Sequence, residues 1–204
     1  HPSDPKQPGH GFARLRRWRL LSTSYDSRQT SVRLQLTHDA TTQTIWPHAF
    51  KLEMSITLGD ALAVELTTTN KGDTPFSFSQ ALHTYLVVGD VREITVDGLD
   101  GATYLDKNSP EPAFDATQSV PLRLDGPTDR VYLSEGPVTV RDPGIGRRVV
   151  STMHGASNVV VWNPWLDRCA GMSLMPAQRS SPGVHHTTSG KPWRWRPRAR
   201  RTRI

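Results

Sequence analysis

Residues 51–69 decide the fold class of this chain. They read KLEMSITL over 51–58, GD over 59–60 and ALAVELTTT over 61–69. Leucine, methionine or isoleucine occupies every second position of the first run, and Leu62, Val64 and Leu66 repeat that spacing in the second. Side chains of a strand alternate between two faces, so a period of two predicts half-buried strands. The Gly-Asp turn signal between the two runs predicts a hairpin.

The same alternation extends over the chain on both sides of this hairpin. Residues 31–37 read SVRLQLT, residues 16–22 form a strand with a basic flank, and residues 75–88 form a strand-like run. Shorter segments, separated by turn signals such as Asp142-Pro143-Gly144, lie at 93–96, 130–133, 137–140, 147–153 and 158–162. The first 167 residues show no amphipathic helical period. Many short, evenly spaced strands predict an all-β fold, an antiparallel sandwich or barrel.

Length and cysteine content narrow the protein class. The 204 residues suffice for one domain with a sizeable core or for two small ones. A single cysteine, Cys169, excludes an intrachain disulfide and fits a reducing compartment. The sequence has no apolar run near the roughly 20 residues of a membrane helix. We therefore expect a cytoplasmic protein with no membrane partner, and a monomer is the favoured state.

The net charge of +6 is unevenly distributed along the chain. Residues 1–167 contain all 19 acidic residues and carry −3, whereas residues 168–204 contain no acid and carry +9. After about Gly171 the alternation stops, and proline, serine, arginine and tryptophan dominate. Such a segment has too little aliphatic content to fold alone. The sequence thus predicts a partial sandwich over 1–172 and a basic tail over 173–204 that is disordered or translated in a shifted frame.

Two histidine-containing motifs are candidates for chemistry. His83 lies in ALHTY, residues 81–85, and a histidine in an apolar strand is either a hydrogen-bonded core group or a proton-transfer group. His10 and Arg14 lie four residues apart in HGFAR, residues 10–14, around a flexible glycine. Such a donor pair suits a phosphate or sugar hydroxyls. The alternative for that motif is a loop with solvated charges.

Three further side chains suit a sugar. Asp129 begins a strand and can accept hydrogen bonds from a polyol, although it could equally pair with Arg130 or Arg14 at the surface. Trp162 and Asn163 end a strand; indole rings stack on the apolar faces of sugars, and an amide both donates and accepts. The alternative is a packed strand end with an Asn-Pro turn.

Metal and nucleic-acid sites are less favoured by the sequence. His185 and His186 are adjacent, so on an extended strand they point to opposite faces and chelate poorly. The arginine and tryptophan residues of 191–203 could bind nucleic acid, but the acidic body lacks a basic surface that would extend such a site.

Taken in order, the motifs resemble those of the hexose-6-phosphate mutarotases, also called glucose-6-phosphate 1-epimerases, of the aldose 1-epimerase superfamily. The matching segments, spread over about 9–172, are HGFAR at 10–14, ALHTY at 81–85, VDGL at 96–99, YLDK at 104–107, TDRVY at 128–132, DPG at 142–144 and VWNPW at 161–165.

The resemblance implies a fold, a reaction and roles for particular residues. It implies an antiparallel β-sandwich of the galactose-mutarotase type and interconversion of the α and β anomers of a hexose 6-phosphate, without metal or organic cofactor. His83 matches the family's general acid, and Arg14 matches an arginine that holds the phosphate. His10 and Asp129 match groups that bind sugar hydroxyls, and Trp162 and Asn163 lie where the family lines the sugar site.

The chain departs from the family pattern at both ends. The strands that precede the HGFAR motif in the family, with a further phosphate-binding arginine, have no counterpart here, so we expect an incomplete sandwich. The family's base is a glutamate in a late strand, and this chain has no Asp or Glu after Asp167. We therefore expect impaired mutarotase activity. A non-catalytic sugar-phosphate binding module is the alternative, and a nucleic-acid binder acting through 191–203 ranks third.

Overall fold

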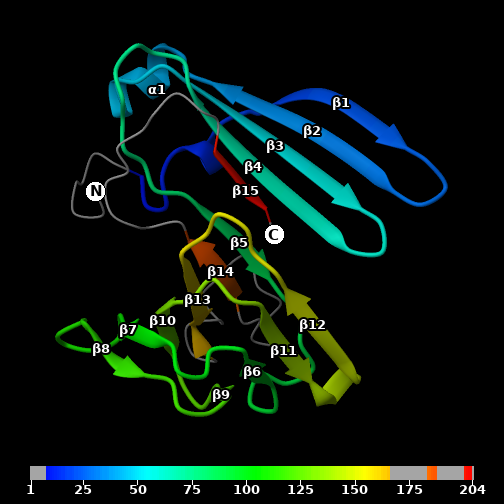
Figure 1. The fold of residues 1–204 in the computed structure, drawn as a ribbon, viewed down its shortest axis with the longest axis vertical. Coiled ribbons are helices and arrows are strands. Elements are labelled where there is room, and N and C mark those ends of the chain that lie inside the picture. Colours follow the sequence, from blue (N-terminus) through cyan, green and yellow to red (C-terminus); the bar gives the residue numbers. More distant parts are fainter. Residues whose placement is uncertain (1–7, 166–182, 188–199, 204) are drawn as a thin grey trace. The chain divides into compact units, whose positions relative to one another are not determined.

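The computed structural model describes residues 8–165, 183–187 and 200–203 (Figure 1). The chain divides into two compact units. The first unit comprises His1–Phe78 and Pro192–Ile204, and the second unit comprises Ser79–Lys191. No helix in the described ranges is long and apolar enough to cross a membrane.

An antiparallel sheet of order β1-β2-β3-β4-β15 forms most of the first unit. Its strands are β1 (Arg19–Tyr25), β2 (Thr30–Thr37), β3 (Phe50–Leu58), β4 (Leu62–Asn70) and β15 (Arg200–Arg203). The 3-10 helix η1 (Ala13–Leu15) precedes β1, and the helix α1 (Ala40–Ile45) joins β2 to β3. Leu58 pairs with Leu62, which confirms the predicted hairpin.

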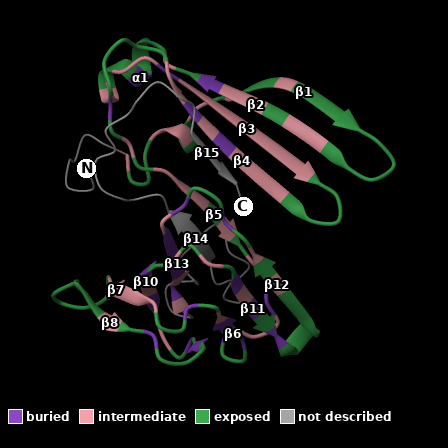
Figure 2. Cartoon of the chain, viewed as in Figure 1, coloured by how far each residue is buried: buried purple, intermediate pink, exposed green. Residues whose placement is uncertain are grey.

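Apolar and polar residues alternate along these strands, so the sheet has one apolar face. Val32, Ile56 and Val64 stand opposite one another on β2, β3 and β4. At one end of the sheet, Leu36 and Phe50 are buried in a cluster with Phe76, and aromatic side chains from loops pack around it. Figure 2 shows that most of this unit is only half-buried or exposed.

The helix α1 was missed by the sequence prediction because six residues are too few to show a helical period. A local capping box begins it. The Asp39 carboxylate accepts a hydrogen bond of 2.7 Å from the Thr42 backbone N–H, and the Asp39 N–H donates to Thr42 Oγ1 at 2.8 Å. These reciprocal bonds satisfy two backbone donors that a helix start leaves free.

Two antiparallel sheets make up the second unit. The larger has the order β5-β14-β13-β10-β7-β8, and the smaller has the order β12-β11-β6-β9. Their strands are β5 (Ala81–Tyr85), β6 (Thr95–Asp97), β7 (Thr103–Asp106), β8 (Phe114–Thr117), β9 (Leu122–Arg123), β10 (Thr128–Leu133), β11 (Val138–Asp142), β12 (Arg147–Ser151), β13 (Asn158–Asn163) and β14 (Gly183–Thr187). The 3-10 helix η2 (Pro143–Ile145) separates β11 from β12.

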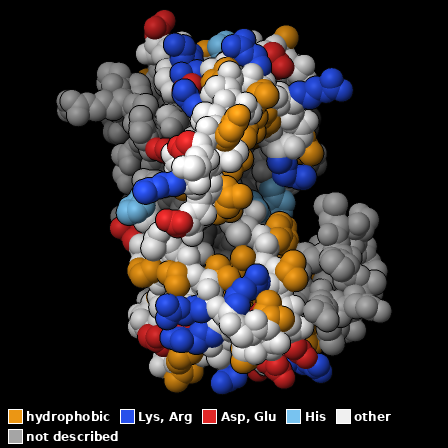
Figure 3. Space-filling view, turned by 90° about the vertical axis from the view of Figure 1, so that its right-hand side faces the viewer, with side chains coloured by type: hydrophobic (Ala, Val, Ile, Leu, Met, Phe, Trp, Pro, Cys, Tyr) orange, Lys and Arg blue, Asp and Glu red, His pale blue; other side chains and the backbone are white. Residues whose placement is uncertain are grey.

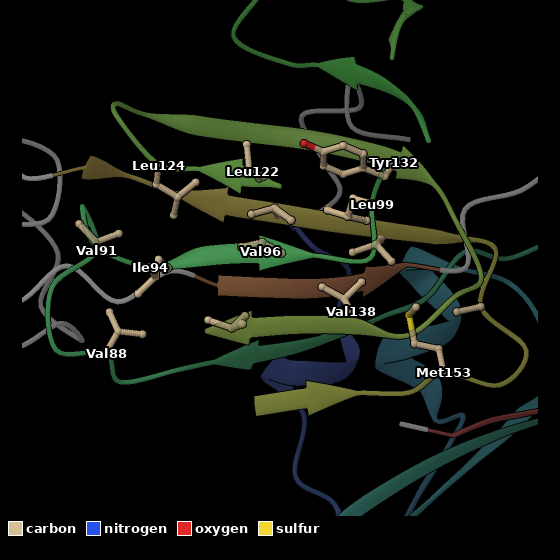
Figure 4. Packing of buried hydrophobic residues seen from close by; sticks show 14 residues of the cluster. Val88, Val91, Ile94, Val96, Leu99, Leu122, Leu124, Tyr132, Val138 and Met153 are labelled. Atoms are coloured by element: carbon tan, nitrogen blue, oxygen red, sulfur yellow. The ribbon is translucent and has the colours of Figure 1, made fainter. Parts of the chain in front are cut away.

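Side chains from both sheets of the second unit form one buried core (Figure 4). Val159 and Val161 of β13 contribute to it from the larger sheet, and Val96 and Val138 contribute from the smaller one. Two apolar sheet faces that share a core define a β-sandwich. The predicted fold class is therefore confirmed.

Most of the predicted strands are confirmed, with two kinds of difference. The run at 75–88 is a strand only over Ala81–Tyr85. The strands β7, β8 and β9 were missed because they are two to four residues long and show no clear alternation. In the tail at 173–204, the structure describes β14 and β15; the rest of the tail lies outside the described residues, so its proposed origin stays a prediction.

Candidate active site

Four neighbouring strands of the larger sheet form the candidate site, and three of them carry the predicted site residues His83, Asp129, Trp162 and Asn163. The four strands are β5, β14, β13 and β10, in that order across the sheet. Tyr85 pairs with Gly183, Gly183 with Trp162, and Trp162 with Asp129. Residues opposite one another in a sheet share a face, and so does His83, two positions before Tyr85. We call this surface the His83 face.

Tyr85 and Trp162 meet across a glycine. Gly183 stands between them in the register, and it has no side chain to separate the two rings. Their centroids are 6.4 Å apart with an interplanar angle of 83°, an edge-to-face arrangement. Trp162 is half-buried and Tyr85 is exposed. The pair offers an aromatic surface on which the apolar face of a sugar can stack.

The imidazole of His83 is exposed. His83 is therefore not a core residue, and its role as a proton-transfer group stays a prediction. Histidine is the side chain whose ordinary pKa suits proton transfer near neutral pH.

Asp129 lies beside Trp162 and is paired with a lysine. Its Oδ1 atom is 3.4 Å from Lys107 Nζ. Arg130 does not take part, because its Nε donates to Asp106 Oδ2 at 3.0 Å on the opposite face of the sheet. The sequence alternative in which Asp129 pairs with Arg130 is thus wrong.

Asn163 is not brought to the His83 face. It follows Trp162 directly, so its side chain points to the core, where only 1% of it is exposed. Its Oδ1 accepts a hydrogen bond of 2.6 Å from the Trp165 backbone N–H. Its buried Nδ2 has no hydrogen-bond partner among the described residues. The geometry gives Asn163 a local structural role, and its predicted contact with substrate gains no support.

His10 and Arg14 belong to the first unit, where an aromatic anchor fixes their loop. Phe12, between them in sequence, packs its ring 5.7 Å from that of Phe50. His10 and Gly11 both adopt positive φ, 61° and 73°, which turns the chain ahead of this anchor. The Arg14 guanidinium donates to the Gly9 carbonyl at 3.2 Å, and both predicted site residues are exposed.

A hollow of about 450 Å³ lies elsewhere in the second unit. Arg130, Gln118 and Asp97 are among its lining residues, and none of the predicted site residues takes part. Within the described ranges, no three His, Cys, Asp or Glu side chains come together as a metal site. The side chains of His185 and His186 lie outside the description.

Comparison with known proteins assigns this chain to a family. The statistical model of the family described as "Aldose 1-epimerase" matches residues 2–190. This chain belongs to the aldose 1-epimerase family. The match covers all of the segments whose motifs resemble hexose-6-phosphate mutarotases.

Individual members of the family agree with this assignment. A protein of Escherichia coli named "Putative glucose-6-phosphate 1-epimerase" is 34% identical over 173 residues, 83% of this chain and 56% of the relative. A protein of the same name from Cenchrus ciliaris is 31% identical over 173 residues, 80% of this chain and 52% of the relative. The chain therefore spans about half the length of the curated relatives it matches.

A solved structure supports the fold. The crystal structure described as a "putative mutarotase" from Salmonella typhimurium superimposes with a TM-score of 0.85 at 26% identity, over 98% of this chain and 68% of that chain. A galactose 1-epimerase from Lactobacillus acidophilus, at 15% identity, shares the fold with a TM-score of 0.63. The sandwich thus belongs to the galactose-mutarotase type, as the family resemblance implied.

Two residues of the candidate site were assigned no role from the sequence. Tyr85 could have been found, because it stands two positions after His83 in a predicted strand and must share its face. The contact of Lys107 with Asp129 could not, because it depends on the pairing of β7 with β10, which the sequence does not reveal.

Proposed function

We propose that the His83 face binds a hexose 6-phosphate of the glucose 6-phosphate type. The single observation that carries this proposal is the gathering of His83, Tyr85, Trp162 and Asp129 on one sheet face. The face combines an aromatic surface, a carboxylate acceptor and a titratable imidazole, the groups that a sugar ring requires. For His10 and Arg14, in the other unit, the proposal rests on the sequence motif and the family.

We infer that the family reaction, in a protein with a full set of groups, is anomer interconversion. A base removes the proton of the anomeric hydroxyl, the C1–O5 bond breaks, and a carbonyl forms at C1. An acid protonates O5 in the same step. Rotation about C1–C2 and closure with reversed proton transfers give the other anomer. His83 is the proposed acid, because its exposed imidazole can donate a proton to O5 near neutral pH.

Within the described strands of the His83 face, the family's glutamate base has no counterpart. The strands β5, β14, β13 and β10 contain one carboxylate between them, Asp129. The strand of Asp129 is three strand spacings from that of His83, roughly 14 Å. His83 also lies two positions before Tyr85 along β5, so its imidazole and the Asp129 carboxylate are too far apart to act on the same carbon. Asp129 therefore suits a hydroxyl remote from the reacting carbon. Without a base, turnover by this chain falls by about 10²–10⁴-fold.

A non-catalytic sugar-phosphate binding module is the second candidate function. The absence of any Asp or Glu after Asp167 favours it. Such a module retains Trp162 and Asp129 and needs no base. The two candidates differ in turnover and agree in binding.

A titration with glucose 6-phosphate tests the shared part of both candidates. We expect saturable binding by calorimetry, and we expect Trp162→Ala to weaken it about threefold to tenfold, the value of an aromatic contact. Tyr25→Ala is the control, because Tyr25 is an exposed aromatic residue of β1 in the first unit, whereas the His83 face belongs to the second unit. Unchanged affinity of Trp162→Ala would contradict the proposed site, and no binding by the unmodified chain would contradict the proposed function.

A further inference from the structure

Two ion pairs join the end of β7 and the residue that follows it, Lys107, to β10 on opposite faces of the sheet. The sequence places Asp106 next to Lys107, and Asp129 next to Arg130. In the structure Asp106 pairs with Arg130, and Lys107 pairs with Asp129. Adjacent residues of a strand point to opposite faces, so each pair has a face to itself.

The first pair commits Arg130 to the core side. Its Nε donates to Asp106 Oδ2 at 3.0 Å, and its guanidinium carbon lies 4.8 Å from the centre of the Tyr104 ring. A planar guanidinium held by a carboxylate and an aromatic face has a fixed position. Arg130 therefore cannot also turn to its neighbour Asp129, which is left to Lys107.

The second pair lies on the His83 face and holds Asp129 at two points. Lys107 Nζ is 3.4 Å from Oδ1, and the Lys107 backbone N–H donates to the Asp129 carbonyl at 2.8 Å. Among the described residues, Oδ2 of Asp129 makes no hydrogen bond or ion pair. One carboxylate oxygen is thus engaged beside Trp162, and the other is available as an acceptor.

The ion pair between Lys107 and Asp129 adds little to the stability of the fold. The side chains of Lys107 and Asp129 are 51% and 28% exposed, and ion pairs at such exposure contribute little to folding. Their effect is on geometry and charge. The lysine restricts the rotation of the carboxylate, and its positive charge balances a negative charge that would repel a sugar phosphate.

We propose that Lys107 is a positioning residue for substrate, which acts by orienting and neutralising Asp129 for a sugar hydroxyl. The inference rests on the proposed function, because it assigns Lys107 to the same sugar-phosphate site. It predicts that Lys107 contributes to the affinity for the sugar phosphate only when Asp129 is present.

A double-mutant cycle on the 204-residue chain tests this dependence, with the dissociation constant for glucose 6-phosphate measured by calorimetry. We expect Asp129→Asn to weaken binding about tenfold or more, as loss of a charged hydrogen-bond acceptor does. We expect Lys107→Met to weaken it about threefold to tenfold and Lys107→Arg to stay within about twofold of the unmodified chain. Lys107→Met added to Asp129→Asn should cause no further loss, because interacting residues are not additive.

Two controls separate this role from others. Lys51 pairs with Glu53 in the first unit at 2.6 Å, so Lys51→Met removes a comparable ion pair and should leave affinity unchanged. Inorganic phosphate, used as a competitor, should inhibit binding to the unmodified chain and to Lys107→Met equally. Weaker competition in Lys107→Met would mean that the lysine contacts the phosphate directly, which would overturn the positioning role.

The experiment distinguishes a failure of the inference about Lys107 from a failure of the proposed function. Additive losses in the double variant, or full affinity in Lys107→Met, would overturn the inference while leaving the proposed function intact. Absence of binding by the unmodified chain would overturn the proposed function and the inference together. Thermal unfolding of each variant shows whether a loss of affinity comes from a loss of folded protein.

Discussion

At the scale of single residues, neighbours in one strand serve different purposes. Trp162 faces the candidate site, whereas Asn163 faces the core and holds the chain beyond the strand through Trp165. The amide oxygen is satisfied, and the amide nitrogen is buried without a partner in the described part of the molecule. The hydrogen bond from the Trp165 N–H to the Asn163 amide oxygen stabilises the turn after the strand, and this accounts for a polar amide at a buried position.

Replacing Asn163 separates these roles. Asn163→Ala leaves the Trp165 N–H without its acceptor, and we expect it to lower the free energy of unfolding by about 1–3 kcal/mol in urea titrations. The affinity of the folded variant for glucose 6-phosphate should not change. Asn108→Ala, which removes an exposed hydrogen bond to Pro127, is the control and should cost about 0.5 kcal/mol or less. A specific loss of sugar affinity would instead support the role predicted from the resemblance.

A second prediction at the residue scale is that the stability of the fold depends on pH through Tyr132. Its ring is fully buried and its hydroxyl donates to Gln118 Oε1 at 2.9 Å. Burial raises the pKa of Tyr132 from 10.0 to about 12. Above pH 10 the unfolded chain loses this proton and the folded chain keeps it, so stability is complete below pH 10 and falls as pH rises towards 12.

Urea unfolding at several pH values checks this prediction. Tyr132→Phe should cost about 1–2 kcal/mol at neutral pH, because Gln118 loses its donor, and it should remove part of the fall between pH 10 and 12. Gln118 and the rest of the chain are unchanged in this variant, so the comparison isolates the phenol. Parallel pH profiles of the two proteins would contradict the assignment.

At the scale of elements, alternation predicted strands well and their pairing poorly. The hairpin of β3 and β4 follows from a local pattern and a two-residue turn signal. The order β5-β14-β13-β10 brings together segments about 100 residues apart, and no local pattern encodes that order. The residue types His83, Trp162 and Asp129 could therefore be named from the sequence, whereas Tyr85 beside Trp162 and Lys107 beside Asp129 required the sheet.

The turn after β6 offers a test of element geometry. Gly98 has a φ of 88°, and a Cβ added there would lie 2.3 Å from the Pro137 carbonyl oxygen. Gly101 has a φ of 76° and nothing within 4 Å. Gly101→Ala should cost about 1 kcal/mol from backbone strain alone, and Gly98→Ala should cost clearly more in the same unfolding assay. Equal losses would show that Pro137 moves away freely.

The strand β14 is the element on which the candidate site depends, because it separates β5 from β13. Its residues pair on both sides, so amide hydrogen exchange over 183–187 should be slow. Val184→Pro removes a ladder N–H from a central strand and should destabilise the second unit, whereas Val184→Thr should be tolerated. Exchange over 183–187 as fast as in an unfolded chain would contradict the strand and would favour the predicted disordered tail.

At the scale of the whole molecule, charges of both signs are mixed on the described surface that Figure 3 displays. On the face that Figure 3 displays, Lys and Arg side chains lie among Asp and Glu side chains in both units. The ion pairs Lys51–Glu53 and Lys107–Asp129 are examples. The net charge of +6 arises from residues 168–204, which carry +9, whereas residues 1–167 carry −3.

One measurement tests the central proposal most directly, that the His83 face binds a hexose 6-phosphate and that this chain turns it over slowly because it has no acidic residue after Asp167. Proton NMR of glucose 6-phosphate with the 204-residue chain reports binding through line broadening and turnover through exchange between the α and β anomeric signals. We predict broadening that Trp162→Ala reduces, with exchange close to the uncatalysed rate. Rapid exchange, or the absence of any broadening, would contradict the claim.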